Sequence, residues 1–138
     1  MEKIHAESFR DLIVYQKAKT ASRLIFELSK TFPKEETYSS TDQIRRSSRS
    51  IGEQIAEAWG KRRYKKHFIS KLTDSDSEQL ETQHWVGDAA DCKYILNDCK
   101  YILKEQEYDL IERLSEIGRM LNSMIKKADK FCGPVRNQ

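Results

Sequence analysis

The sequence predicts an all-α fold, an antiparallel up-down four-helix bundle that forms a single domain over residues 1–138. Composition is the first reason: 38% of the residues are hydrophobic and 34% are charged, with only five Gly and two Pro, which suits long helices better than a β-rich fold. Helical periodicity is the second reason, and it occurs in four segments, about 9–31, 41–60, 63–98 and 105–131. Mostly short connections place consecutive helices antiparallel. A loose tail follows at 133–138.

The first two predicted helices have regular apolar stripes and recognisable ends. The first stripe alternates steps of four and three residues, and Pro33 stops the helix. The second helix starts at Ser40-Thr41-Asp42-Gln43, which has the form of a capping box, and Gly60 ends or bends it. The stripes are Val14, Ala18, Ala21, Ile25, Leu28 and Phe32 in the first helix, and Ile44, Ser48, Ile51, Ile55 and Trp59 in the second.

The third predicted helix contains a repeat near its end. Residues 91–97 and 98–104 are identical at six of seven positions. Because seven residues make almost two helical turns, such a duplication lengthens a helix while keeping its apolar face roughly in register, and the helix is expected to reach about residue 98. The fourth helix has the cleanest stripe, from Ile111 to Ala128, and Gly133-Pro134 closes it.

Charge is sorted along the chain into two blocks. The basic block, Gln43–Lys71, holds nine Lys and Arg against two acids, whereas the acidic block, Thr73–Asp91, holds six acids and no Lys or Arg. Cations on one helix and the following turn can bind phosphates, and Trp59 and Tyr64 could stack on bases. The predicted nucleic-acid-binding residues are Arg45, Arg46, Arg49, Lys61, Arg62 and Arg63.

A purely structural interpretation of the basic block stands beside this one. Arg49 can pair with Glu53, and Glu57 with Lys61, at a spacing of four residues on one helix. Both aromatic residues also fall on core stripes.

The middle of the third helix is unusually polar. The core-spaced positions 75, 79 and 82 are Ser, Gln and Thr, which a bundle core accepts only with satisfied hydrogen bonds. An exposed turn, a buried polar network and a subunit interface are all compatible with this pattern. The interface is preferred, because the acidic block would then face the basic block of a neighbouring subunit. Its predicted interface residues are Asp74, Asp76, Glu78 and Glu81.

Several classes of function are not expected. Glu81 and His84 have the E-x-x-H spacing of di-iron bundles, but such sites need a second motif, and neither His5 nor His67 has a Glu three residues before it. No metal or other cofactor is therefore expected. No G-x-S-x-G or P-loop motif occurs, and neither enzymatic activity nor a small-molecule substrate is expected.

The expected compartment is the cytoplasm. No apolar run approaches the ~20 residues of a membrane span, and the N-terminus lacks the apolar stretch of a signal peptide, so no membrane association is expected. The three cysteines, Cys92, Cys99 and Cys132, are expected to be free thiols, since Cys92 and Cys99 are too far apart for a disulfide within one helix.

Several segments resemble a known family of bacterial four-helix-bundle proteins, whose founding members are encoded within intervening sequences of 23S ribosomal RNA genes. The similar segments, in the same order, are 9–18, 32–36, 43–47, 80–83 and 117–122. Two places depart from the family pattern. Gly52 to Ala58 replaces a common Pro-containing motif, and Lys93 stands where relatives tend to carry a turn Gly.

The resemblance implies a four-helix bundle that forms rings, often homopentamers, with no established activity. A more distant relative is the accessory protein of diversity-generating retroelements, which binds nucleic acid and a reverse transcriptase. The leading hypothesis is therefore a non-enzymatic homo-oligomer whose basic surface contacts RNA or DNA without reading its sequence. The alternative is a self-assembling scaffold or adaptor for a partner protein, with charged faces that only pair subunits.

Overall fold

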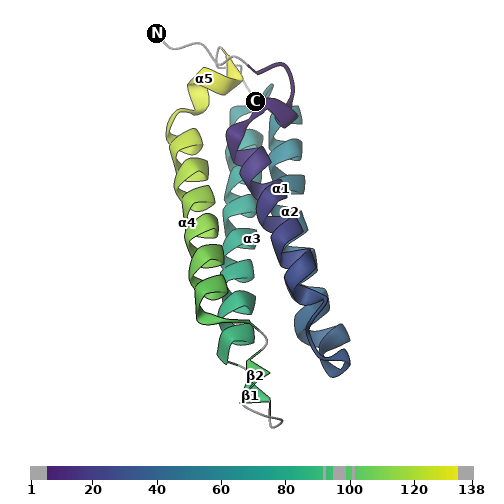
Figure 1. Cartoon of the computed structure of the whole chain (residues 1–138). Helices are drawn as coiled ribbons and strands as arrows, with labels where there is room; N and C mark the ends of the chain where they lie inside the picture. The colour runs from purple at the N-terminus through teal and green to yellow at the C-terminus, as the bar shows by residue number, and fades with distance from the viewer. Residues whose placement is uncertain (1–5, 92, 95–98, 101, 134–138) are drawn as a thin grey trace.

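The computed structural model of the chain describes residues 6–91, 93–94, 99–100 and 102–133 (Figure 1). Within these residues, four long helices form the body: α1 (Ile13–Ser29), α2 (Asp42–Gly60), α3 (Lys65–Asp91) and α4 (Lys104–Lys126). The short elements are the 3₁₀-helices η1 (Phe9–Asp11) and η2 (Lys34–Glu36), the π-helix η3 (Thr37–Thr41), the strands β1 (Lys93–Tyr94) and β2 (Cys99–Lys100), and the helix α5 (Ala128–Cys132).

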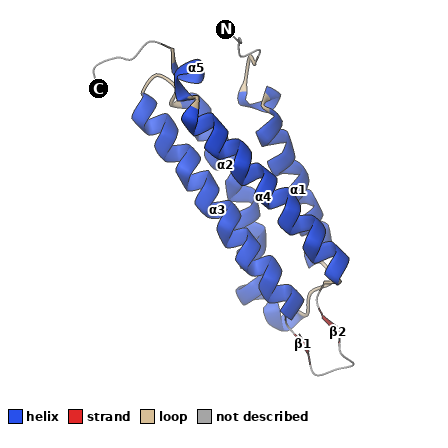
Figure 2. Cartoon of the chain, turned by 90° about the vertical axis from the view of Figure 1, so that its left-hand side faces the viewer, coloured by secondary structure: helices blue, strands red, loops and turns tan. Residues whose placement is uncertain are grey.

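The long helices run alternately up and down the bundle, so the predicted all-α, antiparallel architecture is confirmed (Figures 1 and 2). α2 packs between α1 and α3, and α4 packs against α3 and α1. The α2–α3 turn and α5 lie at one end of the bundle, and the β1–β2 hairpin lies at the other (Figure 1). None of the helices in the described part of the chain combines the length and apolar character that crossing a membrane requires.

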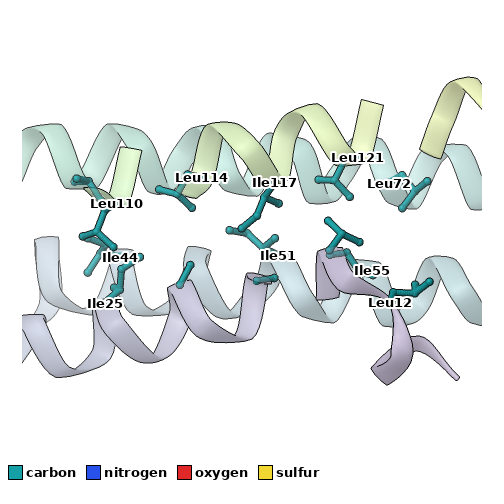
Figure 3. Packing of buried hydrophobic residues seen from close by; sticks show 14 of the residues in the cluster. Leu12, Ile25, Ile44, Ile51, Ile55, Leu72, Leu110, Leu114, Ile117 and Leu121 are labelled. Carbon is teal, nitrogen blue, oxygen red and sulfur yellow. The ribbon is translucent and has the colours of Figure 1, made fainter. Parts of the chain in front are cut away.

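The apolar stripes of the four helices meet in one core (Figure 3). Side chains such as Ile51, Ile55, Leu114, Ile117 and Leu121 are fully buried there. These residues were expected from their helical spacing, because a face repeated every three to four residues is the one that packing removes from water. The core aligns the four helices and thereby decides which charged residues share a face.

The polar middle of α3 is a buried network within one chain. The Ser75 hydroxyl donates to the Ile51 carbonyl at 2.9 Å, and the Thr82 hydroxyl lies 2.9 Å from the Ser47 hydroxyl and 2.8 Å from the Glu78 carbonyl oxygen. The buried network is thus the correct interpretation of the polar core positions, and the interface preferred from sequence is not what satisfies them. Contact between the acidic side chains and another subunit stays a prediction.

Two local expectations were wrong. The third helix ends at Asp91, and Lys93 and Tyr94 pair with Lys100 and Cys99 in an antiparallel hairpin. Two residues of each copy of the duplicated heptad thus form strands, because a repeat containing Tyr and Ile suits a strand as well as a helix. Residues 92 and 95–98 of the expected extension lie outside the described residues.

The second wrong expectation is the capping box. The buried hydroxyl of Ser40, the expected cap, has no hydrogen-bond partner in the described part of the chain, and Thr41 has helical backbone angles and makes no side-chain cap bond. η3 runs directly into α2, and the Asp42 amide donates to the carbonyls of Thr37 and Ser39. A side-chain cap is unnecessary where backbone acceptors already satisfy the first amides.

Candidate nucleic-acid interface

The six predicted binding residues lie at opposite ends of α2. Arg45, Arg46 and Arg49 belong to its first half, whereas residues 61–63 follow its last residue, Gly60. From Arg49 to Lys61 the chain advances twelve residues, or about 18 Å at helical rise. The basic block of the sequence is therefore two separate groups of cations.

Arg45 and Arg49 hold α2 against α1. Their guanidinium carbons lie 4.6 and 5.3 Å from the centroid of the Phe26 ring, which Lys30 also approaches at 5.1 Å. Arg45 Nε donates to the Ser29 hydroxyl at 2.7 Å, and Ser29 is only 2% exposed. Through the cation–π contact and the hydrogen bond to a buried hydroxyl, Arg45 stabilises the packing of α2 against α1.

Arg46 lies among acidic side chains of its own chain. Three members of the acidic block, Asp74, Glu78 and Glu81, share one face of α3 at spacings of four and three residues. Burial is the main cause that raises the pKa of Glu78, nearby carboxylates add to it, and the charge of Arg46 opposes it. Basic α2 and acidic α3 therefore meet inside one subunit.

The fourth predicted interface residue, Asp76, points elsewhere. It lies on the α4 side of α3 and accepts a hydrogen bond from Gln79 at 2.9 Å. Asp74 and Glu81 are exposed, whereas Asp76 and Glu78 are half-buried. The predicted interface residues thus do not form one surface, although three of them share a face.

The second group of cations follows α2 in the α2–α3 turn. Arg62 stacks on Trp59, with its guanidinium carbon 3.5 Å from the ring centroid, and its Nε donates to the Trp59 carbonyl at 2.8 Å. Lys61 and Arg63 are exposed. Trp59 is buried beneath Arg62, whereas Tyr64 is 41% exposed, so only Tyr64 presents a large part of its ring for base stacking.

The α4–α5 junction brings further cations to this end of the bundle (Figure 1). Lys65 at the start of α3 forms an ion pair with Asp129 of α5 at 2.7 Å, and the rings of Phe68 and Phe131 stack at 5.6 Å. We call the cations gathered here the basic end: Lys61, Arg62, Arg63, Lys65, Lys66, Lys126, Lys127 and Lys130. The last three were missed from sequence, because some sixty residues separate them from the turn.

Acidic residues at the basic end are few. Asp129 is paired with Lys65, and the segment before α1 adds Glu7 and Asp11, whose carboxylate accepts the backbone amides of Glu7 and Ser8. Elsewhere, Glu57 pairs with Lys71 of α3 at 3.3 Å, where sequence suggested Lys61. Positive charge therefore dominates this end.

The described residues contain no metal centre that could compete for this role. Across residues 6–91 and the shorter described ranges after them, no three His, Cys, Asp or Glu side chains gather closely enough to hold a metal ion. His84 packs its ring against Trp85 with centroids 4.9 Å apart. Cys132 is a free, half-buried thiol, and burial raises its pKa.

A family model described as 23S rRNA-intervening sequence protein matches residues 10–123. The chain belongs to this family. The resemblance seen in the sequence is thereby confirmed, and the matched region includes the α2–α3 turn but ends before Lys126. The family membership concerns the fold and the ancestry of the chain, since no activity accompanies the description.

A solved structure gives the same result. The chain is similar to a Bacteroides thetaiotaomicron protein described as having unknown function and as belonging to the S23 ribosomal protein family. The two are 30% identical, with a TM-score of 0.67, over 83% of this chain and 99% of the other. No curated protein matches the chain.

Proposed function

We propose that the protein is a non-enzymatic, cytoplasmic, oligomeric helical bundle that binds RNA or DNA through its basic end without reading sequence. The observation that carries this proposal is the meeting of two distant cationic segments, residues 61–66 and 126–130, at one end of the bundle. Clustered Lys and Arg release counterions from a phosphate backbone, which drives binding independently of base identity.

The cations of the basic end differ in exposure and in ion pairing, and both decide which of them can bind a phosphate. Lys61, Arg63 and Lys66 are exposed, and Lys126 and Lys127 have no ion-pair partner in the described part of the chain. Lys65 is engaged by Asp129. Phosphate contacts are therefore assigned first to the exposed turn and to the α4–α5 junction.

A salt titration tests the proposal. Binding of a mixed RNA and DNA pool is measured by fluorescence anisotropy between 50 and 200 mM salt. Contact with about six phosphates predicts a loss of affinity on the order of a thousandfold over this range. The double variant Lys61→Gln/Arg63→Gln should lower the slope of log K against log salt by about 1.8, since each phosphate contributes about 0.9.

The matched control is Lys19→Gln/Arg23→Gln on α1, because both residues are exposed and the net charge changes equally. It should bind as the unchanged protein does. Absence of binding at low salt would refute the proposal. An equal loss in both double variants would show an effect of net charge alone and would count against a defined basic end.

Self-association is proposed alongside nucleic-acid binding, and the family resemblance implies a pentamer. Exposed apolar side chains support association: Ile13 and Leu24 on α1 and Tyr108 on α4, which is 76% exposed. Native mass, measured with and without nucleic acid, tests it. A monomer at micromolar concentration would refute it.

The scaffold or adaptor remains the second candidate, favoured by the exposed acids Asp74 and Glu81. If charge pairing holds the subunits together, Asp74→Lys/Glu81→Lys should lower the native mass. An unchanged mass would exclude that role for the acidic face.

A further inference from the structure

A groove between α3 and α4 is a polar feature that the basic end does not explain. This shallow groove has a volume of about 620 Å³ and follows α4 from Ser115 to Lys127. The helical part of this stretch, from Ser115 to Lys126, rises about 17 Å. The groove is open along its length, so it suits an extended chain better than an enclosed small molecule.

Hydrogen bonds fix the α3 wall of the groove. Gln83 Nε2 donates to Gln79 Oε1 at 2.7 Å, and Gln79 Nε2 donates to Asp76 Oδ1 at 2.9 Å. The two bonds form a relay from Gln83 through Gln79 to Asp76, and Gln79, its middle residue, is only 3% exposed. Across the groove, Asn122 Nδ2 donates to the Gly118 carbonyl at 2.8 Å. These bonds orient two amide side chains, Gln83 and Asn122, and leave each a second N–H and its carbonyl oxygen.

Gly118 is the residue that makes room for the relay. A Cβ atom at this position would lie 2.7 Å from Gln79 Nε2 and 3.2 Å from Asp76 Oδ1. Any side chain at position 118 would therefore displace the amide that anchors the groove wall. The absence of a side chain at Gly118 thus leaves the room that the Gln79 amide occupies.

The charge around the groove favours a polyanion. Lys126 and Lys127 line it together with Arg119, which is paired with Glu112 at 3.1 Å, and its one lining carboxylate, Asp76, already accepts from Gln79. Lys126 and Lys127 also belong to the basic end, so positive potential is continuous from that end into the groove. An acidic peptide could also bind these cations, but the carboxylates that pair with them would not use the donor–acceptor pairs of the Gln83 and Asn122 amides.

We infer that the α3–α4 groove binds a single strand of nucleic acid, with Lys126 and Lys127 on phosphates and with Gln83 and Asn122 on base edges. Each amide presents a donor beside an acceptor, which is the pattern that base edges complement. Unpaired bases expose these edges, whereas a duplex keeps its Watson–Crick edges paired. Leu80, 55% exposed beside the groove, offers an apolar contact for a base face.

This inference rests on the proposed binding of nucleic acid. The basic end contacts phosphates without reading sequence, whereas the groove adds contacts to base edges and therefore a preference for unpaired strands and for some bases over others. The test uses Gln83→Ala/Asn122→Ala, which removes both amides and changes no charge. Anisotropy is measured with a labelled single-stranded RNA of roughly 15 nucleotides and with the duplex of the same length. The affinity for the single strand should fall on the order of tenfold, and the affinity for the duplex should change less than about twofold.

The matched control is Gln16→Ala/Gln54→Ala. Each of these amides also takes part in one intramolecular hydrogen bond, with the Arg10 carbonyl and with Lys71. This variant should bind both ligands as the unchanged protein does, and circular dichroism confirms folding of both variants. A single-stranded DNA of the same length shows whether the 2′-hydroxyl matters.

The outcomes separate this inference from the proposed function. If the unchanged protein binds neither ligand, the proposed function fails and the groove inference fails with it. If it binds both ligands and the groove variant weakens both equally or neither, only the groove inference is overturned. A groove variant of lower native mass would show that the groove joins subunits, which also overturns it.

Discussion

Replacing Arg45 with Ala should destabilise the fold, although Arg45 was first identified as a nucleic-acid-binding residue. The side chain contacts the face of Phe26 at 4.6 Å and donates to the buried Ser29 hydroxyl at 2.7 Å. Both partners belong to α1, so the substitution removes contacts between two helices. Ser29 keeps its own donated bond to the Phe26 carbonyl at 2.9 Å, which limits the loss.

The magnitude follows from these two contacts. A half-exposed cation–π contact contributes about 0.5–1 kcal/mol, and a hydrogen bond from a charged donor about 1.5 kcal/mol at the low end of its range. Together they predict a loss of about 2 kcal/mol. With a urea slope of about 1.5 kcal/mol/M for a chain of this size, the unfolding midpoint should fall by about 1.3 M.

Urea unfolding followed by circular dichroism measures this shift, and Arg63→Ala is the matched control. Arg63 is exposed and has no hydrogen bond or ion pair in the described ranges, so its removal should change stability by less than about 0.5 kcal/mol. The affinity for nucleic acid should show the reverse ranking of the two variants: it should fall more for Arg63→Ala than for Arg45→Ala. An unchanged midpoint for Arg45→Ala would refute the structural role of the Phe26 contact.

Two further predictions concern α3 and α4. Gly118→Ala gains about 1 kcal/mol of helix propensity but crowds Gln79 Nε2 at 2.7 Å, which costs about 1–3 kcal/mol, so it should lower the melting temperature. Gly87→Ala meets nothing within 4 Å and should raise it; equal shifts would refute the crowding. Burial raises the pKa of the Glu78 carboxyl above its ordinary value of 4.5, so the folded state favours the protonated form. The stability that this protonated form contributes is complete below pH 4.5 and is lost as pH rises through the raised pKa. Glu78→Gln should therefore be more stable than the unchanged protein at pH 7 by urea unfolding and equally stable at pH 3; an equal difference at both pH values would contradict the shift.

Much of the fold could be predicted from sequence because local periodicity decides it. Gly60 marked the end of α2, and the apolar stripes gave most of the core, although α1 ends at Ser29, four residues before Pro33. The end of α3 could not be predicted, since a heptad repeat is compatible both with a longer helix and with two strands that pair with each other. Whether the repeat forms a longer helix or a hairpin depends on the difference in free energy between the two conformations. The spacing of apolar residues does not give that difference.

The candidate site was less predictable than the fold, because it depends on contacts between distant segments. Nothing near Lys61 in the sequence indicates that Lys126 and Lys127 lie at the same end of the bundle. Likewise, Phe26 falls beside the first apolar stripe and gave no sign that Arg45 would pack on it. A run of cations in one segment predicts a local positive charge, but it does not predict which of these side chains pack against other helices.

The packing of α2 against α3 also changes the meaning of the sorted charge. Arg46 and the face formed by Asp74, Glu78 and Glu81 lie close enough within one chain for the arginine to affect the pKa of Glu78. In the first half of the basic block, Arg45 and Arg49 pack on Phe26 of α1, and Arg46 lies near the acidic face of α3. The second half of the block has few acidic neighbours, and the α4–α5 junction adds cations to it. Because Arg45 and Arg49 already pack within the fold, whereas the end of the bundle gathers cations from two distant segments, we place the candidate interface at that end and not on the face of α2.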